Sequence, residues 1–162
     1  MRSVVFSLVT VLMATMLCSS SCKKKEEKAF YYECKVNGNY FTYGGGPNDM
    51  QCYTQGDSDL IVGGSLNNES VVFTRHDLTG IKIGNYDIKT PGYPTGAFYS
   101  NQPYVDNIYR TDSNHTGKLF ISELDAINKI IAGTFYFKAY CKKYDSAVNI
   151  TEGRFRLKYL KY

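Results

Sequence analysis

The sequence predicts an all-β fold, and we favour an antiparallel β-sandwich of roughly ten strands. Polar and apolar residues alternate along many short runs, and Gly, Asn, Asp and Pro interrupt these runs about every ten residues. This alternation buries one face of each strand, which is typical of antiparallel sheets with one solvated face. A lipocalin-like closed β-barrel is the alternative, because alternation within strands does not show whether the sheet closes.

The first half of the domain contains short strands separated by turn signals. The run at residues 30–36 has an apolar face formed by Phe30, Tyr32, Cys34 and Val36. Asn37 and Gly38 follow it, and Asn-Gly is the strongest short signal for a β-hairpin. Further strands are expected at residues 40–43, 50–55, 59–66 and 70–76, at the end of 77–88, and at 97–101 and 107–112.

The last third of the chain has the longest alternating runs. Residues 117–125 direct Leu119 and Ile121 inward, and a tight connection at residues 125–128 leads into a long strand at 129–144. One face of that strand is formed by Phe135, Phe137, Ala139 and Cys141. We expect a loop at residues 145–153 and a closing strand at 154–162, with an inward face of Phe155, Leu157 and Tyr159.

The N-terminus has the layout of an export signal. The apolar run at residues 4–17 is shorter than the roughly 20 residues that span a membrane, and it matches a signal-peptide core. The small residues 19–21 then precede Cys22, so this segment resembles the lipobox of bacterial lipoproteins. Cys18 is the competing candidate, but the bulky Leu17 precedes it directly.

The lipobox resemblance implies that residues 1–21 are a signal peptide and that Cys22 carries a diacylglyceryl group, which is the expected link to the membrane. Stable anchoring needs more than one acyl chain, and a diacylglyceryl cysteine supplies two. Residues 22–29 would form a charged, solvated tether before a single β domain at 30–162. Residues 25–27 (Lys-Glu-Glu) resemble the signal that sends some Bacteroidota lipoproteins to the outer surface of the outer membrane. A simple spacer explains them equally well, so the face of the outer membrane is left open.

Composition argues against several functional classes. The net charge is +4 with both signs interspersed, so nucleic acid is not an expected partner. Three cysteines lie in predicted strands, and a disulfide among Cys34, Cys52 and Cys141 is left open. With two histidines and no C-x-x-C motif, we expect no metal site, and we expect no cofactor.

We find no sequence motif for catalysis and one suggestive aromatic stretch. His76 and His115 lie in turn-like segments, and no G-x-S-x-G motif is present, so we expect a protein that is not an enzyme; a hydrolase is the less favoured option. Between residues 84 and 110, prolines alternate with aromatic residues that could bind a glycan or an envelope protein: Tyr86, Tyr93, Phe98, Tyr99, Tyr104 and Tyr109. The alternative is that these rings fill the core and edges of a domain without tryptophan.

Four motifs occur in a characteristic order: "CKVNGNYFTY", "IGNYDI", "TGKLFISELDAINKIIAGTFYFKAY" and "ITEGRFRLKY". In this order they resemble a family of Bacteroidota lipoproteins known as a domain of unknown function, over residues 33–159. The resemblance implies a location and a fold but no catalytic residues. The sequence therefore predicts a membrane-anchored envelope lipoprotein with a non-enzymatic binding module, and a purely structural envelope lipoprotein is the alternative.

Overall fold

A computed structural model of the chain describes residues 30–43, 50–55, 59–66, 68–76, 80–89, 95–101 and 108–161. The predicted signal peptide, Cys22 and the tether lie outside these residues, as do Tyr93 and Tyr104. Within the described ranges, no helix is long or apolar enough to cross a membrane.

All regular structure in the described ranges is β-strand, as the sequence predicts. The strands are β1 (Tyr31–Val36), β2 (Asn39–Tyr43), β3 (Met50–Gln55), β4 (Asp59–Leu66), β5 (Glu69–His76), β6 (Gly84–Ile88), β7 (Thr95–Ser100), β8 (Ile108–Arg110), β9 (Gly117–Asp125), β10 (Ile130–Cys141), β11 (Ser146–Lys158) and β12 (Leu160–Lys161). These twelve strands compare with the roughly ten that we expected. One reason is that the predicted last strand is interrupted at Tyr159, which separates the short β12 from β11.

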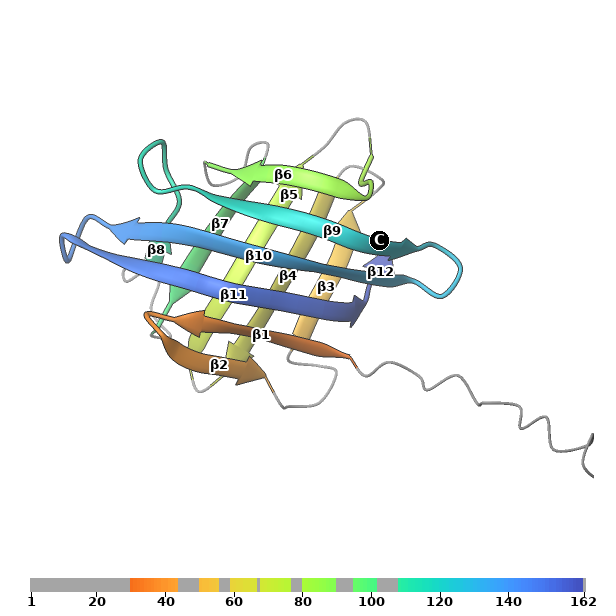
Figure 1. Ribbon diagram of the computed structural model, residues 1–162, viewed down its shortest axis with the longest axis horizontal. Coiled ribbons are helices and arrows are strands. Elements are labelled where there is room, and N and C mark those ends of the chain that lie inside the picture. The colour runs from red at the N-terminus through yellow and green to blue at the C-terminus, as the bar shows by residue number, and fades with distance from the viewer. Residues whose placement is uncertain are drawn as a thin grey trace, which may run out of the picture.

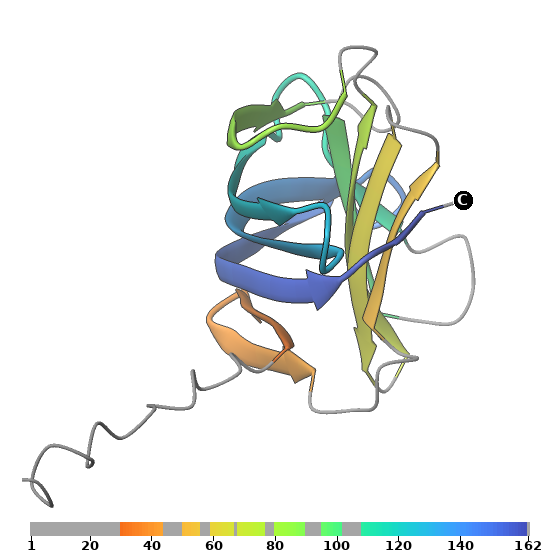
Figure 2. The ribbon, with the colours of Figure 1, turned by 90° about the vertical axis from the view of Figure 1, so that its right-hand side faces the viewer.

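The strands form one curled sheet that folds into two facing layers (Figure 1, Figure 2). The front layer has the order β6-β9-β10-β11-β1-β2, and the back layer has the order β12-β3-β4-β5-β7-β8. A single pair, Tyr140 with Arg110, joins β10 to β8 at one corner. At another corner the chain passes from β11 into β12, and β12 pairs in parallel with β3. The described sheet has open ends at β12, β2 and β6, so the predicted all-β, mainly antiparallel fold is confirmed, with two layers as in a sandwich and a curl as in an open barrel.

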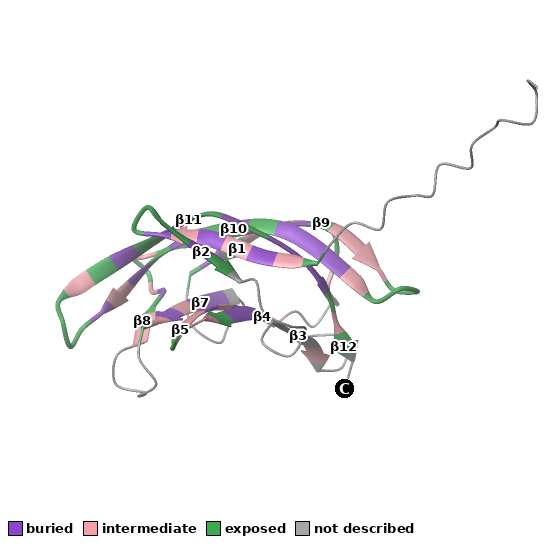
Figure 3. Ribbon diagram, turned by 90° about the horizontal axis from the view of Figure 1, so that it is seen from below, coloured by how far each residue is buried: buried purple, intermediate pink, exposed green. Residues whose placement is uncertain are grey.

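Aromatic side chains from both layers meet in the core. Phe73 of the back layer lies 5.2 Å from Phe135 and 5.4 Å from Phe155 of the front layer, measured between ring centroids. Tyr32 stacks on Phe135 at 5.4 Å, and its hydroxyl donates a 2.9 Å hydrogen bond to the carbonyl of Val71 in the back layer. Such ring pairs stabilise a core beyond the area they bury. Buried and exposed residues alternate along the strands that enclose these rings (Figure 3).

The predicted faces of the strands are largely confirmed. Tyr32, Cys34 and Val36 are buried in β1, and the predicted inward residues of β9 and β10 are buried as well. Phe30 departs from this pattern, because it precedes β1 and is 47% exposed. The Asn37-Gly38 hairpin is also confirmed, with φ values of 50° and 87°. A two-residue type I′ turn requires positive φ at both positions, and Asn and Gly tolerate it.

The predicted loop at residues 145–153 is wrong, because most of it belongs to β11. Val148 and Ile150 point into the core, but further along the strand it is Phe155 and Leu157 that do so. The inward positions therefore change from even to odd numbers within β11. The cause is a β-bulge at Glu152, whose φ is 53°, where the pairing with both β10 and β1 shifts by one residue. A bulge breaks the two-residue period by which a strand is recognised in a sequence.

Gly153 completes this bulge and lies directly against Phe135. A Cβ atom at Gly153 would lie 2.5 Å from the carbonyl oxygen of Phe135 and 2.6 Å from its ring. The backbone oxygen cannot move without disturbing the ladder between β10 and β11. Only glycine therefore allows β11 to approach β10 this closely.

We expect Gly153→Ala to lower the free energy of unfolding by about 1–3 kcal/mol, because the added methyl group overpacks the contact with Phe135. Urea unfolding of the purified protein measures this loss. Thr151→Ala is the matched control, since Thr151 is exposed on the same strand, and it should change stability much less. Equal stability of the glycine and alanine proteins would contradict the close approach.

Candidate functional site

The three cysteines of the described chain are free and buried in strands, which answers the disulfide question that the sequence left open. Burial raises the pKa of the Cys34 thiol to about 12, and the negative charges of Glu69 and Glu33 add to this effect. Burial alone raises the pKa of Cys52 to about 12. Because the thiolate is the reactive form, Cys34 and Cys52 are protonated core residues rather than nucleophiles.

Both histidines pair with a nearby aspartate. The Nδ1 atom of His76 at the end of β5 contacts the Asp59 carboxylate at the start of β4. The Nδ1 atom of His115 lies 2.9 Å from Asp112, and its ring stacks on Tyr140 at 4.9 Å. The first pair joins the end of β5 to the start of β4, and the stacking of His115 on Tyr140 joins the loop between β8 and β9 to β10. In the described ranges, no group of three or more His, Cys, Asp or Glu side chains is placed to hold a metal ion.

The Asp112 carboxylate organises the loop between β8 and β9. Burial tends to raise its pKa, but hydrogen bonds from the backbone N–H groups of Asn114 and His115 and from the His115 ring outweigh that effect and lower it. This is an Asx-type turn, in which a side chain replaces backbone partners. The structure therefore gives His115 a role in the conformation of this loop.

The structure separates the aromatic residues proposed from the sequence. Tyr99 of β7 is 4% exposed and donates a 3.2 Å hydrogen bond to Glu69. Its ring lies 5.8 Å from that of Tyr109 on β8, whose hydroxyl lies 3.2 Å from the hydroxyl of Ser146. Phe98 is half-buried on β7. Tyr99 and Tyr109 thus come together, with Tyr99 contributing to the core.

Tyr86 lies apart from this pair, on β6 at the edge of the front layer. The guanidinium of Arg75 from the back layer stacks over its ring at 3.7 Å, and its hydroxyl bonds the backbone of Lys82. This contact fastens β6 to the end of β5. Whether any of the six aromatic residues holds a ligand stays a prediction, and Tyr93 and Tyr104 lie outside the described residues.

The outer face of the front layer carries a more extensive set of side chains. Cross-strand pairing aligns these side chains in two neighbouring rows that run across all six strands of the layer. The first row contains Asn85, Phe120, Thr134, Arg154, Glu33 and Thr42. The second row contains Asp87, Lys118, Tyr136, Lys35 and Tyr40, together with Glu152, which the bulge leaves without a register partner between β10 and β1. We call these twelve residues the two-row face.

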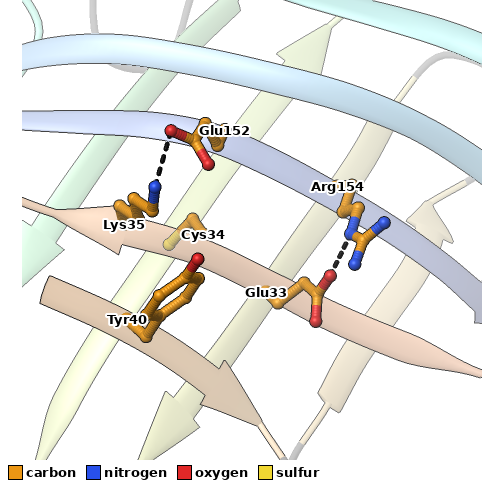
Figure 4. A pocket seen from close by; sticks show the side chains of 6 residues that line it. All are labelled: Glu33, Cys34, Lys35, Tyr40, Glu152 and Arg154. Atoms are coloured by element: carbon orange, nitrogen blue, oxygen red, sulfur yellow. Dashed lines mark hydrogen bonds and ion pairs between the residues drawn. The ribbon is translucent and has the colours of Figure 1, made fainter. Parts of the chain in front are cut away.

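Ion pairs along and between the rows connect neighbouring strands. Lys118 on β9 lies 2.8 Å from Asp87 on β6. On the other side of the layer, Lys35 on β1 lies 2.7 Å from Glu152 on β11 (Figure 4). The hydrogen bond to Glu152 is the main cause that raises the pKa of Lys35, and the hydrogen bond from Lys118 is the main cause that lowers the pKa of Asp87.

The pair between Arg154 and Glu33 lies next to the Lys35–Glu152 pair (Figure 4). The Nε–H group of Arg154 donates a hydrogen bond to the Glu33 carboxylate, and the Arg154 guanidinium also lies 5.8 Å from the ring centre of Tyr31. In Figure 4 the ring of Tyr40 rises from β2 beside Lys35, whose ammonium lies 4.9 Å from the ring centre. This part of the two-row face therefore combines both charges with an aromatic surface.

Two shallow hollows cover most of the two-row face. One of about 590 Å³ lies over β6, β9, β10 and β11 and is flanked by the exposed rings of Phe120 and Tyr136. The other, of about 320 Å³, lies over β11, β1 and β2 beside Tyr40. Glu152 and Arg154 line both hollows, so the two are adjacent on β11. We take this surface as the candidate functional site.

A family model described as a domain of unknown function (DUF6252) matches residues 33–157. The chain belongs to this family. The DUF6252 domain thus extends from Glu33 on β1 to Leu157 on β11, and the two-row face lies within it. No curated protein and no solved structure matches the chain.

Sequence reasoning missed the two-row face because its members come from six strands. The strands of the front layer have a mostly polar outer side, and Tyr40, Phe120 and Tyr136 are aromatic exceptions within that pattern. Exposed aromatic rings on a polar strand face are the signal that could have pointed to it. The members of the two-row face come together through the register of the strands and the pairing of β6 with β9. The alternation of residues within a strand specifies neither of these.

We expect the free energy of unfolding to fall as pH rises from about 9 towards 12. Unfolded thiols ionise near pH 9.0, whereas the folded protein keeps Cys34 and Cys52 protonated to about 12, so stability present below pH 9 is lost above it. Each thiol contributes a slope of up to about 1.4 kcal/mol per pH unit. Tyr32 adds to the fall, since burial also raises its pKa.

The double variant Cys34→Ala/Cys52→Ala isolates the thiols from the tyrosines. Urea unfolding at about pH 8 and 10.5 should show a smaller loss of stability in the variant than in the natural chain. The cavities that alanine creates lower stability at both pH values. The quantity compared between the two proteins is therefore the change in the free energy of unfolding from about pH 8 to 10.5. An equal difference in both proteins would show that the thiols ionise normally when folded.

Proposed function

We propose that the chain is a lipoprotein of the bacterial cell envelope, anchored in the outer membrane through Cys22, and that its DUF6252 domain is a non-enzymatic binding module. The anchor is inferred from the sequence around Cys22 and from its resemblance to Bacteroidota lipoproteins. The family model shows that residues 33–157 form a DUF6252 domain, whose function is unknown. The binding role is inferred from the two-row face.

The observation that carries the binding role is the arrangement of exposed rings and fixed charges over the two hollows. Tyr136 is 53% exposed and Phe120 is 39% exposed, although both lie in the middle of a sheet layer. Exposed ion pairs contribute only about 0–1 kcal/mol each to stability, so folding alone gives a weak reason for three pairs in this register. A surface that presents rings and hydrogen-bonding groups together suits a glycan or an envelope protein as ligand.

The tether would let this surface act near a membrane. Eight residues separate Cys22 from Tyr31, the first residue of β1, and a fully extended chain would span this separation with about 30 Å. Six of these positions, residues 23–28, are charged and favour solvated chain over a packed element. The domain would therefore remain close to the bilayer with freedom to orient the two-row face.

We expect Cys22→Ala to release the protein from the membrane, because the substitution removes the side chain that would carry the diacylglyceryl group. The measurement is the distribution of the protein between membrane and soluble fractions of lysed cells. Cys18→Ala is the matched control and should remain in the membrane fraction. Release by Cys18→Ala, with retention of Cys22→Ala, would move the anchor to Cys18.

We expect a photo-crosslinking amino acid at Tyr136 to form adducts with an envelope component in intact cells. Tyr136 is at the centre of the two-row face, and a ligand held there lies within reach of the probe. Tyr144 is the matched control position, because it is 48% exposed in the turn between β10 and β11 and outside the face. Adducts from both positions alike, or from Tyr144 alone, would argue against a binding role for the face.

A further inference from the structure

We propose that the two-row face binds a neutral polysaccharide chain that crosses the strands of the front layer. This inference rests on the proposed binding function and specifies the class of ligand. Four features support it: the balanced charges of the face, the placement of its exposed rings, the shape of the two hollows, and the main-chain pairing of the strands beneath them.

The charges of the two-row face balance one another. Among the twelve residues, three acidic side chains pair with three basic ones: Asp87 with Lys118, Glu152 with Lys35, and Glu33 with Arg154. Lys89, next to the face, also lies 3.3 Å from Asp87. A strongly anionic or cationic ligand would have to compete with these pairs. A neutral ligand with many hydroxyl groups can instead accept from the ammonium and guanidinium groups and donate to the carboxylates while the pairs stay in place.

Exposed aromatic rings provide flat surfaces beside these polar groups. Phe120 pairs across the strands with Thr134, and Tyr136 pairs with Lys118, so the two rings are diagonal neighbours on β9 and β10. Diagonal neighbours on one face of a sheet are about 7–8 Å apart, within reach of aromatic side chains. Sugar rings have an apolar C–H face that packs on such a surface and an edge of hydroxyl groups for the polar side chains.

The hollows extend this site in one direction. The larger hollow, about 590 Å³, has the size of a small-ligand pocket, and the smaller one of about 320 Å³ continues from it through Glu152 and Arg154. The exposed ring of Tyr40 lies at the far end of the smaller hollow and is 80% exposed. The path from Phe120 across the bulge to Tyr40 is therefore long and shallow, which suits a chain of sugar units rather than a compact ligand.

The backbone beneath the face argues against an added peptide strand. Peptides that extend a sheet bind to an edge, where main-chain groups are open. Here β9, β10, β11 and β1 each have a paired strand on both sides, so their main-chain groups are engaged within the sheet. Recognition on this face must use side chains, which agrees with the rings and hydroxyl-binding groups described above.

The test titrates the purified full chain in detergent with three soluble neutral polysaccharides, a β-glucan, an α-mannan and a galactan, and with anionic polygalacturonate. Calorimetry should show binding of at least one neutral polysaccharide, and its affinity should change less than about twofold between low and high salt, because no charge is neutralised. Binding of polygalacturonate alone, or of none of the four, would overturn the proposal.

Variants locate the binding on the face. Phe120→Thr/Tyr136→Thr removes both rings but keeps strand-forming residues, and it should weaken binding at least about tenfold. Phe120→Tyr/Tyr136→Phe keeps both rings and should bind within about threefold of the natural chain, and Tyr144→Thr should bind unchanged. Equal binding by the double threonine variant, with an unchanged unfolding midpoint, would overturn the proposal.

Failure of this inference can be told apart from failure of the binding module. Protein adducts at Tyr136 in cells, together with no polysaccharide binding by the purified chain, would overturn the polysaccharide ligand and leave the binding module standing. No adduct specific to Tyr136 and no polysaccharide binding would overturn both.

Discussion

The close contact between Gly153 of β11 and Phe135 of β10 is the constraint on which much of this structure depends. The bulge at Glu152 changes which residues of β11 face inward, and it brings Phe155 and Leu157 into the core. Glu152 is the extra residue of this bulge, and its side chain lies on the outer face, 2.7 Å from Lys35. One local distortion therefore determines both the aromatic core and the centre of the candidate site.

The two sides of β11 have different physical roles. On the inner side, Phe155 packs with Phe73 and Phe135, and burial of such rings supplies most of the stability that a β-sandwich gains. On the outer side, the ion pairs are solvated and contribute little to folding. Substitutions on the outer face can therefore change binding while the core maintains the fold, which makes the face suitable for ligand recognition.

Much of the fold could be predicted from the sequence, because most of its strands follow local rules. Alternation identified the buried faces of β1, β9 and β10, and Asn37-Gly38 identified the first hairpin. The start of β11 could not be predicted, since its alternation is interrupted at Glu152 and its turn-forming residues resemble a loop. The two-row face could not be predicted either, because it depends on register across six strands, and β6 pairs with β9 from a distant part of the sequence.

A shallow, neutral face has a physical consequence for a protein on a tether. A ligand there remains open to water along its length, so each site would bind with modest affinity, because exposed hydrogen bonds and ring contacts contribute little individually. Several copies on one membrane would, however, meet successive segments of the same polysaccharide at a high effective concentration, which raises overall avidity without any new contact. The proposed anchor at Cys22, outside the DUF6252 domain, and the expected charged tether would then do more than locate the protein. They would give a weak site the multivalency that it needs to hold a long repeating ligand.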